Sequence, residues 1–60
     1  MVVVYYDKEQ HKHITIKNVW KIERSINHFI YADGIRVYYT ENEERKGIRI
    51  PNDYVTSINV

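Results

Sequence analysis

Three histidines are the side chains in this sequence that could hold a metal ion. His11 and His13 are two positions apart, so in a strand both imidazoles would project on one side, and His28 could supply a third ligand. No carboxylate stands at a fixed spacing from them, and the chain has no cysteine. We expect the three histidines on the surface or at strand ends, and we predict no metal site and no cofactor.

Catalytic nucleophiles and phosphate-binding loops are scarce. Ser25 and Ser57 are the only serines, and neither lies in a sharp turn flanked by glycine. Gly34 and Gly47 are too far apart to form a glycine-rich loop. A chain of 60 residues also leaves little volume for a small-molecule pocket. The sequence therefore predicts a protein that is not an enzyme.

Charge and hydropathy narrow the class of partner. Nine Lys and Arg against eight Asp and Glu give a net charge of +1, which is not typical of a dedicated nucleic-acid or membrane-surface binder. No apolar run approaches the roughly 18 residues of a membrane-spanning helix, and the apolar start of the chain lacks the basic flank of a signal peptide. We expect one cytoplasmic domain, residues 1–60, without a membrane partner.

Residues 27–40 carry the strongest turn signal, because Asp33-Gly34 separates two runs of β-branched and aromatic residues. A two-residue turn there would pair Phe29 with Tyr38 and Tyr31 with Arg36. One face of this hairpin would then be aromatic, with a single Arg, where a solvated face is normally polar. The four residues either stabilise the ladder alone or form a face that another part of the chain, a second copy or a partner covers.

The remaining strands are expected at residues 2–6, 13–17, 20–24, 48–50 and 54–60, with a turn at 25–27, charged loops at 7–12 and 41–47, and a turn after Pro51. The first strand is apolar throughout, which predicts burial on both faces. Residues 19–30 also fit helical spacing, but their β-branched content favours a strand. Trp20 is expected in the core. The predicted fold is all-β, with five to six short strands in a small barrel or a rolled antiparallel meander.

The segment 47–55, GIRIPNDYV, resembles the C-terminal end of SH3 domains, and its tight match covers residues 50–55. The aromatic start of the chain is loosely similar to the first strand of that family. The chain departs from the family at residues 34–37, where those domains carry a Trp. The resemblance implies an SH3-like barrel and a groove for proline-rich peptides lined by Tyr6, Pro51 and Tyr54.

A protein-binding function fits the composition best. Six Tyr, one Trp and one Phe are a high load of the residues that dominate interfaces. In size and composition the chain also resembles small β proteins of phages and prophages of Gram-positive bacteria, several of which inhibit host proteins or defence systems. We expect a non-enzymatic inhibitor or modulator that acts by occlusion through Phe29, Tyr31, Arg36 and Tyr38. The alternatives are a single-stranded nucleic-acid binder, which would stack bases on the same aromatic face, and an SH3-type peptide binder.

A homodimer is also expected, because chains below about 70–80 residues without disulfides or metals often depend on oligomerisation.

Overall fold

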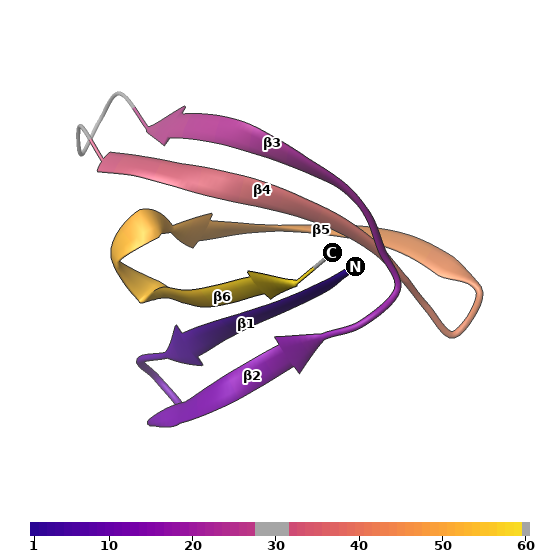
Figure 1. Cartoon of the computed structure of the whole chain (residues 1–60), viewed down its shortest axis with the longest axis horizontal. Coiled ribbons are helices and arrows are strands. Elements are labelled where there is room, and N and C mark those ends of the chain that lie inside the picture. Colours follow the sequence, from indigo (N-terminus) through magenta and orange to yellow (C-terminus); the bar gives the residue numbers. More distant parts are fainter. Residues whose placement is uncertain (28–31, 60) are drawn as a thin grey trace.

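Six antiparallel strands in two sheets make up the computed structural model of the protein, which describes residues 1–27 and 32–59 (Figure 1). The elements are β1 (Val2–Asp7), β2 (Lys12–Ile16), β3 (Val19–Asn27), β4 (Ala32–Glu41), β5 (Glu44–Pro51), the 3₁₀ turn η1 (Asn52–Tyr54) and β6 (Val55–Asn59). One sheet has the order β2-β1-β6 and the other β3-β4-β5. The predicted all-β class is confirmed. Within the described ranges, no helix is long and apolar enough to cross a membrane.

The β1–β2 hairpin is closed by a turn that Asp7 organises. One Asp7 carboxylate oxygen accepts hydrogen bonds from the backbone N–H groups of Glu9 (2.9 Å) and Gln10 (3.1 Å). This side-chain-to-backbone pattern is the reason why Asp favours turns. The expected loop is confirmed, although it is shorter than predicted because β1 extends to Asp7 and β2 begins at Lys12.

A bend at Asn18 carries the chain from one sheet to the other. Asn18 has a φ of 58°, a left-handed conformation that Asn tolerates better than most residues. Its carbonyl accepts a hydrogen bond from the backbone N–H of Thr40 (3.2 Å), and the next residue, Val19, donates to the carbonyl of Met1 (3.3 Å). In Figure 1 β2 runs through this bend directly into β3.

The predicted turn at Asp33-Gly34 is wrong, because both residues lie inside β4. Gly34 pairs with Ser25 on one side and with Pro51 on the other, and its φ is not positive. The turn expected at residues 25–27 is also wrong, since β3 continues to Asn27. The strand predicted for residues 20–24 is confirmed, and β3 extends it to Val19–Asn27; residues 28–31 lie outside the described part.

The shifted register changes every pair that the Asp33-Gly34 turn implied. Arg36 pairs with Glu23, Val37 with Ile22, and Tyr38 with Lys21. The physical reason is steric: Gly34 permits close contact with β5, so its lack of a side chain serves packing and not a turn.

The hairpin turn with positive φ lies instead at Asn42-Glu43. Both residues have left-handed φ values, 51° and 66°, as a type I′ turn requires. Glu41 pairs with Glu44 at the base of the turn, so β5 begins there. The solvated loop predicted for residues 41–47 is therefore wrong, because strand pairing occupies most of it.

Pro51 is the last residue of β5, as predicted, and its φ of −58° leads into η1. The chain then enters β6, which pairs with β1 and shifts register between Val4 and Tyr5. This return places η1 between the ends of β5 and β6, where it contacts both β4 and β1.

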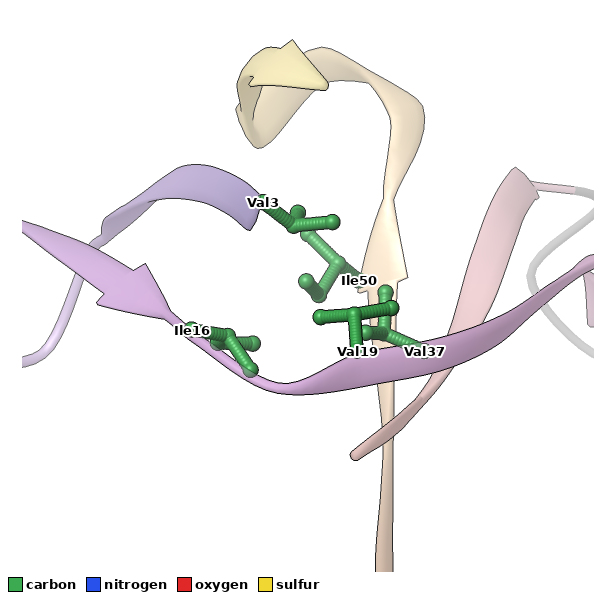
Figure 2. Close-up of a cluster of buried hydrophobic side chains, with 5 residues drawn as sticks. All are labelled: Val3, Ile16, Val19, Val37 and Ile50. Carbon is green, nitrogen blue, oxygen red and sulfur yellow. The ribbon is translucent and has the colours of Figure 1, made fainter. Parts of the chain in front are cut away.

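The core lies between the two sheets and is aliphatic. Its buried members come from five strands and are Val3, Ile16, Val19, Val37 and Ile50 (Figure 2). In β1 only Val3 is fully buried, so the expected burial on both faces is wrong. Trp20 does not belong to the core either, since 47% of it is exposed.

Candidate functional site

Tyr6, Pro51 and Tyr54 line one groove of about 320 Å³. They come from the end of β1, the end of β5 and η1, which meet because β6 returns beside β1. Hydrophobic residues of the groove include Tyr5, Ile48 and Ile50, and charged residues are Asp7, Lys8, Glu9 and Arg49. The structure therefore brings together the three residues that the SH3 resemblance implied.

The groove is built on ordered neighbours. The ring of Tyr6 meets the ring of His13 edge-on, with centroids 5.3 Å apart. Tyr54 packs against the core, and Asp7 is held by the turn described above. Burial, reinforced by the nearby Asp7 carboxylate and by Tyr39, raises the pKa of Tyr5 above its ordinary value of 10.0. At neutral pH Tyr5 is therefore a neutral phenol.

Two of the four residues predicted for a partner face lie on one side of a strand. Arg36 and Tyr38 are two residues apart on β4 and share its outer side, opposite the buried Val37. Phe29 and Tyr31, the other two predicted members, lie outside the described residues. The cross-strand pairs predicted among these four residues are wrong, because β4 pairs with residues 19–27.

Trp20 is the contact residue that sequence reasoning missed. The register of β3 shifts between Val19 and Lys21. The centroids of the Trp20 and Tyr38 rings are 5.4 Å apart, and the two ring planes are inclined by 38°. The Arg45 guanidinium lies over the indole at 5.1 Å, and the Lys21 ammonium over the Tyr38 ring at 5.8 Å. We call this outer surface of β3, β4 and β5 around Trp20 and Tyr38 the aromatic sheet face.

A bulge is needed to put Trp20 there. Strict alternation back from Ile22, which pairs with the buried Val37, would place Trp20 on the inner side. The register shift between Val19 and Lys21 lets both Trp20 and Lys21 lie on the outer side near Tyr38. No turn residue or glycine marks this shift in the sequence, so alternation alone placed Trp20 in the core. The high aromatic content was the available signal for an exposed ring.

A second cleft, of about 410 Å³, opens between the sheets. Its hydrophobic lining residues are Tyr5, Ile14, Ile16, Tyr39 and Ile48, and its polar lining residues are Thr15, Lys17, Asn18, Thr40, Glu41 and Asn42. This volume lies within the range of small-molecule sites, so the expectation of too little space is wrong. The cleft has one carboxylate and one ammonium among its lining residues and no nucleophilic thiol.

The histidines do not assemble a metal centre in the described part of the chain. His11 and His13 are both exposed, and no group of three His, Asp or Glu side chains there could hold an ion. His28 lies outside the described residues. Comparison with protein-family models, curated proteins and solved structures finds no match for this chain.

Proposed function

We propose that the protein is a non-enzymatic module that binds an extended segment of a partner protein in the Tyr6–Pro51–Tyr54 groove. The observation that carries this proposal is that Tyr6, near one end of the sequence, meets Pro51 and Tyr54, near the other, in one groove. Aromatic and proline side chains lose little conformational entropy on contact, so they supply binding area at low cost.

A proline-rich segment is the ligand that this surface suits best. Such a segment is already extended in the polyproline II conformation, and its rings dock between aromatic side chains. Residues 7–9 bring two carboxylates and one ammonium to the groove, whereas its other cation, Arg49, comes from β5. A basic residue of the peptide would therefore lie against residues 7–9.

We also propose that the two sheets form an SH3-like barrel. The two-residue bend between β2 and β3 lets one stretch of chain serve both sheets, and a 3₁₀ turn precedes the last strand. Both features agree with the resemblance of residues 47–55, and the groove lies where that resemblance implies.

The biological role that we propose is inhibition or modulation of a larger protein by covering the bound segment. The support is the resemblance in size and composition to small phage-encoded β proteins. A homodimer remains our proposal for the free protein, and the exposed Ile26 and Ile58 offer apolar surface for it. Sedimentation equilibrium measures that association directly.

Peptide titration followed by NMR tests the groove. Peptides selected from a displayed random library would be added to ¹⁵N-labelled protein, and we expect shift changes at Tyr6, Pro51 neighbours and Tyr54. Tyr6→Ala and Pro51→Ala should each weaken binding about tenfold, the cost of removing one interface anchor.

Tyr38→Ala is the matched control, since it removes a tyrosine from the aromatic sheet face and should leave peptide affinity unchanged. Urea unfolding of each variant establishes that it is folded. Shift changes confined to the aromatic sheet face, or full affinity in both groove variants, would reject the groove as the binding site.

A further inference from the structure

The aromatic sheet face concentrates positive charge. Its cross-strand rows are Lys21–Tyr38–Gly47, Glu23–Arg36–Arg49 and Thr40–Arg45. Four cations and one carboxylate give these rows a net charge of +3, whereas the whole chain carries +1. The chain as a whole is nearly neutral, but the strand register gathers cations on one face and makes that face basic.

Like charges face each other within that surface. Arg36 lies directly opposite Arg49 across the β4–β5 ladder, so the strand register sets two cations of like charge side by side on this face. The one carboxylate nearby, Glu23, contacts Lys21 at 2.7 Å. Among the described residues no carboxylate pairs with Arg36 or Arg45, so their charges are available to an external anion.

The two rings form a partly exposed platform between these cations. Trp20 is about half exposed, and Gly47 opposite Tyr38 adds no side chain beside the phenol ring. Arg45 and Lys21 already stack on the rings and keep their charged groups at the platform. Flat aromatic faces flanked by Arg and Lys are the elements with which proteins hold unpaired bases and their phosphates.

We propose that the aromatic sheet face binds single-stranded nucleic acid, with bases stacking on Trp20 and Tyr38 and phosphates pairing with Arg36 and Arg45. A second copy of the chain is disfavoured there, because a two-fold contact would bring the same cations together. An acidic protein would satisfy the charges but would not use the stacking platform. The residues assigned here to bases and phosphates do not line the peptide groove, although Arg49 of the three rows borders both surfaces, so either function stands without the other.

The test uses Trp20, the only Trp of the chain, as the reporter. Oligo(dT) of about 15 nucleotides, a length that covers one small-barrel site, is titrated against the intrinsic fluorescence. We expect quenching, and log K should fall with log salt with a slope of about −2 to −3, as three or four phosphate contacts on a single strand require. Binding of oligo(dT) is compared with that of duplex DNA of the same length and with that of poly-glutamate.

Two classes of variant separate stacking from charge. Tyr38→Ala should weaken oligo(dT) binding by about 5- to 100-fold with an unchanged salt slope, since one stacked base is lost. Arg36→Ala and Arg45→Ala should each reduce the slope by about 0.7. Lys12→Ala, an exposed cation on the other sheet, should change neither quantity, and Pro51→Ala should bind oligo(dT) normally.

Three results would overturn the proposal. If oligo(dT) does not quench Trp20 fluorescence at about 50 mM salt, the site is excluded. Binding to phosphates strengthens as the salt concentration falls, so a real site would be occupied under this condition. Equal binding of poly-glutamate assigns the face to an acidic protein. An effect of Lys12→Ala as large as that of Arg36→Ala means that only total charge matters.

Discussion

Gly34 lies so close to Ile50 that a β-carbon at position 34 would stand 2.7 Å from the Ile50 carbonyl oxygen. The Arg49 guanidinium covers the same position at 3.1 Å and donates a hydrogen bond from Nε to Ser25 Oγ at 3.1 Å. Gly34→Ala should therefore lower the free energy of unfolding by about 1–3 kcal/mol, the usual cost of overpacking. Urea denaturation measures this change.

Gly47→Ala is the matched control in the neighbouring strand. A β-carbon there would be 3.4 Å from the Tyr38 ring, an ordinary contact, and its φ is not positive. We expect unchanged stability or a gain of up to about 1 kcal/mol from the smaller entropy of unfolded Ala. Equal losses at positions 34 and 47 would contradict the close approach of β4 and β5 at Gly34.

The turn at Asn42-Glu43 predicts a stabilising substitution. Glu43 has a φ of 66°, which costs an ordinary L-residue about 1–2 kcal/mol, whereas Gly adopts it freely. After the added flexibility of the unfolded chain is subtracted, Glu43→Gly should raise stability by about 0.5–1 kcal/mol. Glu44→Gly, one residue later in the extended β5, should instead lower it by a similar amount. Thermal unfolding of both variants compares them directly.

Gly34 inside β4 and the turn at Asn42-Glu43 show which parts of the fold the sequence could predict and which it could not. Ile14 and Ile16 alternate with polar residues, and Pro51 cannot continue a ladder, so strands and their ends could be inferred from local chemistry. Whether Gly34 lies in a turn or in a strand depends on its pairing with β5, which local sequence does not show. Gly can adopt the backbone conformation of either. Glu43 carries no signal for a left-handed turn, because the pairing of β4 with β5 imposes it.

The candidate sites divide in the same way. The grouping of Tyr6, Pro51 and Tyr54 could be expected only through the resemblance to SH3 domains, since no local rule joins residue 6 to residue 54. Trp20 was expected in the core because alternation places it on the same side as Ile22, and alternation has no means of showing the bulge between Val19 and Lys21. The basic face could not be expected, because the net charge of +1 averages over both sheets.

The stability lost on truncating Trp20 to Ala, compared with that lost on truncating a core residue, tests the placement of Trp20. Ile50 is 1% exposed, so Ile50→Ala should cost about 2–5 kcal/mol through lost burial and the cavity that remains. Trp20→Ala removes a larger side chain, but it loses mainly the contacts with Tyr38 and Arg45, worth about 1–2 kcal/mol together. A greater loss at Trp20 than at Ile50, measured in urea, would place the indole in the core.

Tyr5 predicts a loss of stability in alkali. Its pKa is raised in the folded protein, chiefly by burial, so the unfolded chain ionises first as the pH increases. The contribution of Tyr5 is fully present below about pH 10 and is lost as the pH rises through the folded pKa. Tyr5→Phe should flatten the decline of unfolding free energy above pH 10 and remove a late step from the absorbance titration at about 295 nm. An unchanged decline would contradict this assignment.

Glu23 should limit the affinity of the aromatic sheet face for a polyanion. Glu23→Gln removes the one carboxylate of the three rows, so their net charge rises from +3 to +4. Stability should change little, because the contact with Lys21 is exposed to water. Oligo(dT) should bind about two- to threefold tighter at low salt, and this gain should vanish at high salt as screening increases.

Glu9→Gln supplies the control for total charge. It raises the net charge of the chain by the same one unit, but it changes the exposed turn between β1 and β2 on the other sheet. The two variants therefore differ only in where the charge is removed. A gain confined to Glu23→Gln locates the polyanion on the aromatic sheet face, whereas equal gains would mean that binding depends on net charge and not on this surface.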